Sequence, residues 1–192
     1  VYDIAIIGAG AAGLHLLQAM LEEPYFQDKK IVLIDKDAKN SNDKTWCFWE
    51  LSKGKWDEIV AHQWAHGKFN GQQQEIVLHL DPYRYKMIRA IDFYDLARQK
   101  ASAATQVDWL QAEVRSVGNV SGKPVILLDN GQQITVEYLF DSRIDKAFYQ
   151  EADPYYRVWQ HFKGWVIESE EEIFNPEEFV MMDFRIKHED TT

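Results

Sequence analysis

Three glycines near the N-terminus have the spacing G-x-G-x-x-G, at Gly8, Gly10 and Gly13, and Asp35 ends the next apolar run. Gly8 permits a tight turn, Gly10 lets the backbone approach a pyrophosphate, and Gly13 allows a helix to pack closely on a strand. An acid at position 35 can accept the hydroxyls of a ribose. The pattern predicts a dinucleotide site, and the alternative is a glycine-rich structural turn. Because Asp35 is an acid rather than an arginine, FAD or NAD is favoured over NADP.

The surrounding sequence predicts the elements that would position these residues. Residues 2–7 form a short apolar run typical of a strand, and the apolar residues of 14–21 repeat with helical spacing. The run "KKIVLID" predicts a second buried strand. The N–H groups and the positive dipole end of the helix would then face the phosphates. The candidate cofactor-binding residues of this segment are Gly8, Gly10, Ala11, Ala12, Gly13, Asp35 and Lys36.

After Asp35 the sequence predicts antiparallel hairpins instead of the further strand–helix units of an NAD domain. Two strand-like runs are joined by a glycine-containing turn within 62–83, and "DNG" at 129–131 separates two alternating apolar runs. A last strand, "EYLFDSR", ends at Asp141, where open α/β sheets bind ligands. This pattern is typical of flavoproteins of the glutathione-reductase type. The predicted fold class is therefore α/β: a Rossmann-like FAD-binding domain with antiparallel hairpins and the start of a β-rich substrate domain.

The chain also resembles the bacterial lycopene cyclase family. The residues that carry the resemblance occur in the order found in the family: "IIGAGAAGL", "LIDKDAKNSNDKTWCFWE", "YKMIRAIDFYDL", "LFDSR", "QHFKGWVIE" and "FVMMDFR". Lys44 stands where family members usually have arginine. The resemblance implies an incomplete FAD-binding domain at 1–45 and 86–143, and incomplete substrate-domain strands at 46–85 and 144–192.

The resemblance implies non-covalently bound FAD that works in its reduced form, with NADPH as a reductant that is needed but not consumed. The substrate would be lycopene or a related linear carotene delivered from a membrane. A proton is added to the ψ end, the carbocation attacks a neighbouring double bond, and another proton leaves, which closes a β-ionone ring. Such an enzyme of carotenoid biosynthesis is an isomerase or intramolecular lyase, because the reaction is redox-neutral.

Three further cofactor contacts are expected. Arg89 would lie near the flavin or its diphosphate, and the alternative is a surface salt bridge. The resemblance implies that a main-chain group of Val114 holds the adenine, and Asp141 is expected at the cofactor from its place at a strand end.

The aromatic run "TWCFW" could stabilise a carbocation without offering it a nucleophile. Trp46, Phe48 and Trp49 are therefore candidates to line the substrate pocket or to pack near the flavin. The alternative is that they are core aromatics that brace the loop after Asp35. Cys47 is expected to be a small buried hydrophobic residue.

No catalytic residue is predicted within the chain, because the glutamate that the resemblance implies as the acid would lie beyond Thr192. The chain is expected to be an N-terminal portion that is inactive alone and exposes an edge on which two copies could associate. Two alternatives remain: another FAD enzyme of the same fold, such as an isoprenoid reductase or aromatic hydroxylase, and a non-catalytic nucleotide-binding module.

Composition excludes several classes of partner. A net charge of −10 argues against nucleic acid. A single cysteine rules out a multi-cysteine metal site, and His62 and His66 lack a third ligand, so no metal is predicted. The absence of a basic, apolar leader favours a cytoplasmic protein, with transient peripheral contact with the inner membrane left open.

Overall fold

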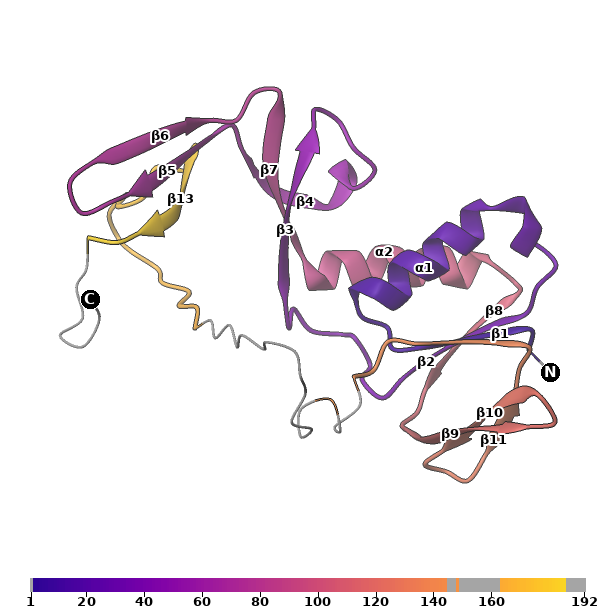
Figure 1. Cartoon of the computed structure of the whole chain (residues 1–192). Coiled ribbons are helices and arrows are strands. Elements are labelled where there is room, and N and C mark those ends of the chain that lie inside the picture. Colours follow the sequence, from indigo (N-terminus) through magenta and orange to yellow (C-terminus); the bar gives the residue numbers. More distant parts are fainter. Residues whose placement is uncertain (1, 145–147, 149–162, 186–192) are drawn as a thin grey trace. The chain divides into compact units, whose positions relative to one another are not determined.

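The computed structural model describes residues 2–144, 148 and 163–185. The chain divides into two compact units: residues 1–42 with 91–153, and residues 43–90 with 154–192 (Figure 1). The sequence predicts domain boundaries at 45/46, 85/86 and 143/144. The first two differ because strand β7 (Tyr83–Arg89) pairs along its whole length with β3 (Thr45–Leu51), which keeps both strands in the second unit.

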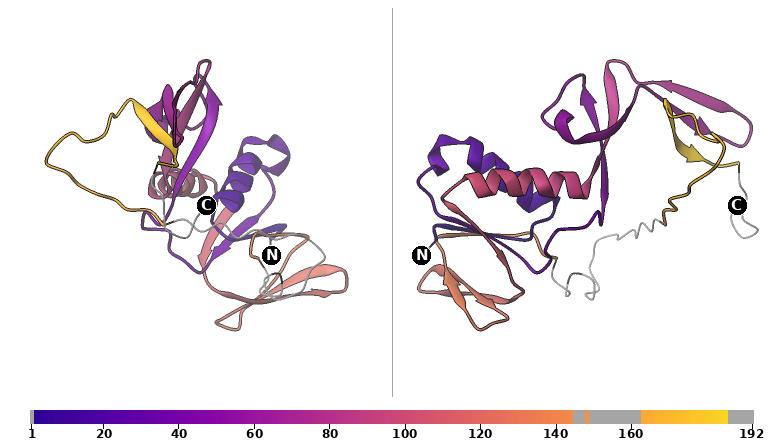
Figure 2. Two further views of the ribbon diagram at one scale, coloured as in Figure 1. Left: turned by 60° about the vertical axis from the view of Figure 1, so that its left-hand side comes forward. Right: turned by 180° about the vertical axis from the view of Figure 1, so that it is seen from behind.

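The first unit is built on a parallel sheet with the strand order β12-β1-β2-β8. Its strands are β1 (Ile4–Ile7), β2 (Ile31–Asp35), β8 (Val107–Gln111) and β12 (Tyr138–Asp141). Helices α1 (Ala11–Glu22) and α2 (Ala90–Ala103) lie on one face of this sheet, as Figures 1 and 2 show, and the short helix η1 (Pro24–Phe26) follows α1. The strand–turn–helix–strand order predicted around the glycines is present.

An antiparallel meander covers the other face of the parallel sheet (Figure 1). It consists of β9 (Val114–Val120), β10 (Lys123–Leu128) and β11 (Gln133–Thr135), and the turn of the β10–β11 hairpin contains the predicted "DNG". Side chains alternate between the two faces of a strand. Ala5 and Ile7 of β1 therefore pack against the meander core, whereas Ile6 faces α1 and approaches Gly13.

The second unit contains two small sheets. The first has the order β3-β7-β4, with β4 at Val60–Trp64, and the helix η2 (Asp57–Ile59) precedes β4. The second has the order β13-β5-β6, formed by β5 (His66–Asn70), β6 (Glu75–His79) and β13 (Glu178–Asp183). The ring of Phe179 on β13 contacts the rings of Tyr85 and Trp64, with centroid distances of 4.6 Å and 5.7 Å. These ring contacts join the two sheets.

Lys86 is a charged residue inside the second unit, with only 1% of its surface exposed. Its Nζ donates hydrogen bonds to Glu50 Oε2 at 2.9 Å, to Asp57 Oδ1 at 2.5 Å and to the Ser52 carbonyl at 2.8 Å. A buried ammonium is tolerated only where it is paired and hydrogen-bonded, and these three acceptors meet that requirement.

None of the helices that the structure describes is both long and apolar enough to cross a membrane.

Candidate functional site

The turn between β1 and α1 has the backbone that its glycines predict. Gly8 has φ +99°, in the region that favours glycine, and its N–H donates to the carbonyl of Ile34 at 2.8 Å. A β-carbon on Gly13 would lie 1.9 Å from the Gly8 carbonyl oxygen, so α1 can lie this close to the end of β1 only because residue 13 has no side chain. These two glycines set the position of the helix start relative to the sheet.

Gly10 leaves open space at the start of α1. It is the N-cap of the helix, no side chain caps it by a hydrogen bond, and nothing lies within 4 Å of where its β-carbon would be. The first N–H groups of a helix have no partner within the helix, and they carry the positive end of its dipole. The first turn, which contains Ala11, Ala12 and Gly13, therefore presents backbone donors to a space large enough for an anionic group.

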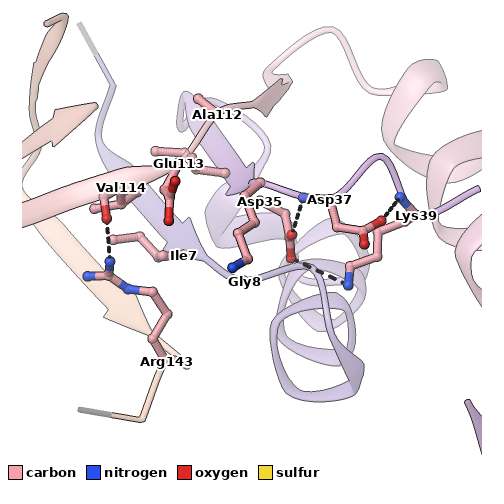
Figure 3. A pocket seen from close by; sticks show the side chains of 11 residues that line it. Ile7, Gly8, Asp35, Asp37, Lys39, Ala112, Glu113, Val114 and Arg143 are labelled. Carbon is pink, nitrogen blue, oxygen red and sulfur yellow. Dashed lines mark hydrogen bonds and ion pairs between the residues drawn. The ribbon is translucent and has the colours of Figure 1, made fainter. Parts of the chain in front are cut away.

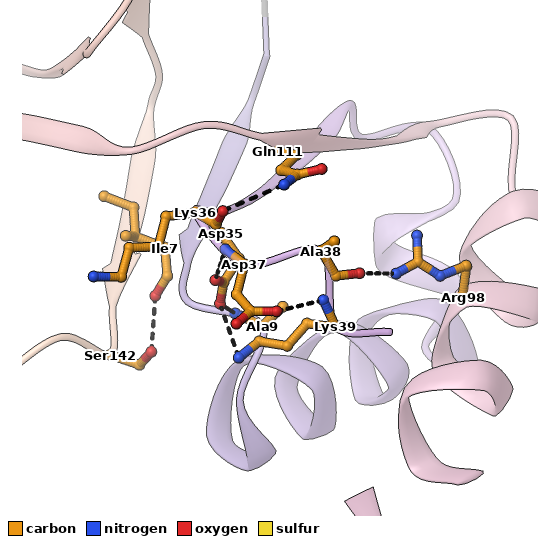
Figure 4. A network of polar contacts seen from close by, with 10 residues as sticks. All are labelled: Ile7, Ala9, Asp35, Lys36, Asp37, Ala38, Lys39, Arg98, Gln111 and Ser142. Atoms are coloured by element: carbon orange, nitrogen blue, oxygen red, sulfur yellow. Dashed lines mark hydrogen bonds and ion pairs between the residues drawn. The ribbon is translucent and has the colours of Figure 1, made fainter. Parts of the chain in front are cut away.

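Asp35 at the end of β2 connects the glycine turn to the loop that follows. Its Oδ2 accepts a hydrogen bond from the N–H of Ala9 at 2.6 Å, and its Oδ1 accepts one from the N–H of Asp37 at 2.8 Å (Figure 4). Two N–H bonds leave acceptor capacity on a carboxylate, which has about four lone-pair sites. The side chain is only 12% exposed, so it is held in one place beside the turn.

Lys39 brings a positive charge next to Asp35. Its Nζ lies 3.8 Å from Asp35 Oδ2 and 5.4 Å from the centroid of the Tyr94 ring. Lys39 has φ +52°, and its N–H donates to Asp37 Oδ1 at 2.7 Å, which supports this unusual backbone (Figures 3 and 4). Lys39 was not predicted as a site residue, because nothing in the sequence shows that the loop turns back toward the acid.

A cavity of about 350 Å³ opens beside these groups. Its walls come from the ends of β1 and β2, the loop after Asp35, the link between β8 and β9, and Arg143 after β12 (Figure 3). The predicted residues Gly8, Asp35, Lys36 and Val114 all line it. The carboxyl ends of parallel strands thus meet at one cavity, as ligand sites in open α/β sheets do.

Arg143 forms one side of the cavity and is a second residue that the sequence did not single out. Its Nε and Nη2 donate to the carboxylate of Asp141 at 2.9 Å and 2.7 Å, and its Nη1 donates to the Val114 carbonyl at 2.8 Å. Burial alone would raise the pKa of Asp141, but the hydrogen bonds from Arg143 outweigh it and the pKa is lower than usual. Asp141 therefore holds Arg143 and lies next to the cavity without lining it.

Arg89 is not among the residues that line this cavity. It is the last residue of β7 in the second unit. Its predicted contact with the flavin or diphosphate stays a prediction.

One expectation for the aromatic run is corrected, that for Cys47, whereas the roles of Trp46, Phe48 and Trp49 stay predictions. In β3, Trp46 and Phe48 point to one face and Cys47 and Trp49 to the other, because side chains alternate along a strand. The three aromatic residues therefore do not form one wall. Trp49 packs against Tyr85 at a centroid distance of 4.6 Å, and Cys47, expected to be buried, is exposed.

Among the described residues, no group of three or more His, Cys, Asp or Glu side chains could hold a metal ion.

Solved structures with a similar fold include the halogenase PltM in complex with phloroglucinol and FAD, at a TM-score of 0.55 and 12% identity. A protein from Photorhabdus luminescens described as an FAD-containing monooxygenase has a TM-score of 0.52 and 15% identity. The matches cover 74% and 73% of this chain but only 34% and 39% of those chains. At these identities the likeness shows an α/β fold of the kind found in FAD-dependent enzymes.

No curated protein sequence matches the chain. The family described as "Lycopene cyclase protein", however, matches residues 3–192, which is nearly the whole chain. The glycine turn, Asp35 and the strand ending in Asp141 all lie within that match. The chain therefore belongs to the lycopene cyclase family.

Proposed function

We propose that the first unit binds the ADP portion of FAD. The observation that carries this proposal is the position of Asp35, whose carboxylate is held by the glycine turn on one side and faces the cavity on the other. The open space at Gly10 and the uncapped start of α1 fit a diphosphate. The free donors at the start of α1 and the acceptor Asp35 support a site for the diphosphate and the ribose of an ADP group.

Each part of the nucleotide has a residue to hold it. The first turn of α1 would donate to the phosphates, Asp35 would accept the ribose hydroxyls, and a main-chain group of Val114 would hold the adenine. Ile7 and Ile34 supply the apolar floor of the cavity. FAD, when bound, supplies the flavin ring on which the family's chemistry depends.

For the whole protein we propose the redox-neutral closure of β-ionone rings at the ψ ends of lycopene, with reduced FAD and NADPH as reductant. Membership of the lycopene cyclase family supports this proposal. The chain spans about a third to two fifths of the length of the structures it resembles. The acid that protonates the polyene is expected outside this chain, and contact with a membrane surface to obtain the carotene is part of the same proposal.

The binding of nucleotides tests the first proposal directly. The 192-residue chain is titrated with FAD, ADP and NAD, and binding is followed by calorimetry. FAD and ADP are expected to bind, and Asp35→Ala is expected to weaken both at least tenfold, about 1.4 kcal/mol, because the ribose loses its acceptor. Asp28→Ala is the matched control, because Asp28 is an exposed acid whose Oδ1 lies 3.8 Å from Nζ of its neighbour Lys29.

Two results would contradict the proposal. Binding of NAD as tight as that of FAD would indicate a dehydrogenase-like site. Equal affinity of wild type and Asp35→Ala for ADP would show that Asp35 does not contribute to the site.

The reaction of the whole protein is tested with lycopene and NADPH in D₂O. A proton from solvent is added and a different proton leaves, so each closed ring is expected to carry one deuterium, and NADPH should not be consumed in proportion to product. Oxidation of NADPH without carotene would instead favour a reductase or hydroxylase of the same fold.

A further inference from the structure

The ammonium of Lys39 is enclosed beside the glycine turn without a hydrogen bond of its own. Its side chain is only 11% exposed, and Nζ lies 3.8 Å from Asp35 Oδ2 and 5.4 Å from the centroid of the Tyr94 ring. An ammonium has three donors, and 3.8 Å is too long for a hydrogen bond. In the part of the chain that the structure describes, these donors have no acceptor within hydrogen-bond distance. A ligand that supplies the missing acceptors would therefore stabilise this largely buried charge.

This ammonium stands at the start of α1. Asp35 Oδ2, which faces Lys39, also accepts the N–H of Ala9 at 2.6 Å. Figure 4 shows Lys39 and Ala9 approaching the same carboxylate. Ala9 directly precedes Gly10, the N-cap of the helix, which no side chain caps. The charge of Lys39 therefore lies beside the backbone donors that the first helical turn offers to an anion.

The acids of this site would repel a diphosphate in the absence of Lys39. The Asp35 side chain is only 12% exposed, and Asp37 adds a second carboxylate to the cavity wall. Like charges repel more strongly where little water separates them, and an adjacent cation offsets that repulsion. Lys39 therefore allows an acid that accepts a ribose and an anion at the helix start to lie side by side.

We propose that Lys39 is a phosphate-binding residue of the nucleotide site, and that its ammonium donates to the diphosphate beside the first turn of α1. This inference rests on the proposed binding of an ADP group. It adds a charged donor to the backbone N–H groups of the helix, and it gives Asp35 two tasks, which are to accept the ribose and to hold the ammonium in place.

The test compares two ligands that differ only in the diphosphate. ADP and adenosine are titrated into the 192-residue chain, and dissociation constants are taken from NMR shifts of the backbone amides. Lys39→Gln is expected to weaken ADP binding about tenfold, because a charge-assisted hydrogen bond is lost, and to change adenosine binding less than about twofold. Lys39→Arg keeps the charge and the donors, so it should retain most of the affinity for ADP.

Lys29→Gln is the matched control. Lys29 Nζ also lies 3.8 Å from an aspartate oxygen, Asp28 Oδ1, and 5.7 Å from the centroid of a tyrosine ring, that of Tyr25. It comes before the start of β2, whereas Asp35 is at the end of that strand, so both affinities should stay unchanged. Added NaCl should weaken ADP binding more in wild type than in Lys39→Gln, because salt screens the contact between ammonium and phosphate. Thermal unfolding shows whether each variant keeps the fold.

The outcomes are distinguishable. Equal losses of affinity for ADP and adenosine in Lys39→Gln would show that Lys39 acts only through Asp35. That result, or wild-type affinity of Lys39→Gln for ADP, would overturn the phosphate contact while leaving the nucleotide site intact. Failure of wild type to bind ADP at all would overturn the proposed nucleotide site itself, and this inference with it.

Discussion

The side chain of Ser142 occupies the space that a β-carbon on Gly8 would need. Such a carbon would lie 2.1 Å from Ser142 Oγ, a hydroxyl that donates to the carbonyl of Ile7 at 2.8 Å. The N–H of Ser142 donates to the same carbonyl at 3.0 Å. The end of β12 is thereby locked to the glycine turn, although the two segments are far apart in the sequence.

Gly8→Ala should destabilise the first unit for two separate reasons. A non-glycine residue at φ +99° costs about 1–3 kcal/mol, and the new methyl group collides with the Ser142 hydroxyl. Adding Ser142→Ala removes Oγ, and the nearest remaining atom of residue 142 is its Cβ at 3.5 Å. The double variant should therefore regain part of the lost free energy of unfolding but not all of it.

Urea unfolding of the two single variants and the double variant measures this coupling. Strictly additive effects would show that the hydroxyl and the new methyl group do not compete for the same space.

Gly10→Ala should separate binding from folding. The added methyl group meets no protein atom within 4 Å, so the free energy of unfolding is expected to change by less than about 1 kcal/mol. The same methyl group would stand where the proposed diphosphate approaches the backbone, so ADP affinity should fall at least tenfold. Gly118→Ala on β9 is the control, because its methyl group also enters open space but lies away from the proposed phosphate site.

Calorimetric titration with ADP and a thermal unfolding curve for each variant provide both readouts. Unchanged ADP affinity in Gly10→Ala would place the phosphates elsewhere.

The strand–turn–helix unit was predictable because each part has a local cause. Position 8 requires a positive φ, and position 13 has no room for a side chain. Glycine satisfies each requirement, so a single residue type in the sequence reveals it. The "DNG" hairpin is equally local, with Gly131 at φ +84°. Such features depend on neighbours in the sequence, so a motif and a periodicity are enough to find them.

The residues missed by sequence reasoning depend on partners that are distant in the chain. Arg143 is a site residue because it reaches the Val114 carbonyl, and "LFDSR" alone shows only its neighbour Asp141. The exposure of Cys47 has another cause. The strand period of two places Cys47 and Trp49 on the face of β3 opposite to Trp46 and Phe48, and the composition of the run alone does not show which face is covered.

The second unit should lose stability in acid through the cluster around Lys86. The hydrogen bond from Lys86, with that from the N–H of Gly54, holds the pKa of Asp57 below its usual 3.8. A lowered carboxyl pKa contributes stability that is present above pH 3.8 and is lost as the pH falls toward the lowered value.

The same cluster predicts a loss in strong base. Burial alone would lower the pKa of Lys86, but its pairs with Asp57 and Glu50 raise the pKa above 10.5. That contribution is complete below pH 10.5 and declines as the pH rises through the raised value.

Asp57→Asn removes the titrating carboxyl and should flatten the acid side of the stability profile. Urea unfolding of the second unit, followed by tryptophan fluorescence between pH 3 and 6, measures the slope. Glu58→Gln, at the neighbouring exposed acid of η2, should keep the wild-type slope. A wild-type slope in Asp57→Asn as well would show that other carboxyls cause the acid dependence.

The contact between Gly67 and Phe179 makes the most direct prediction about how β13 is held on β5. A β-carbon on Gly67 would lie 2.7 Å from the Phe179 ring, so the absence of a side chain lets the ring pack against β5 at Gly67 and contact Tyr85. Gly67→Ala should push the ring away and cost about 1–3 kcal/mol, as overpacking of a core does. Exchange of the amide hydrogens of Glu178–Asp183 should then accelerate, because β13 pairs with β5 at this point. Adding Phe179→Leu, which shortens the side chain, should restore part of the protection, and Gly118→Ala in the first unit should leave it unchanged. If Gly67→Ala exchanged as slowly as wild type, the ring contact would not be what holds β13 in place.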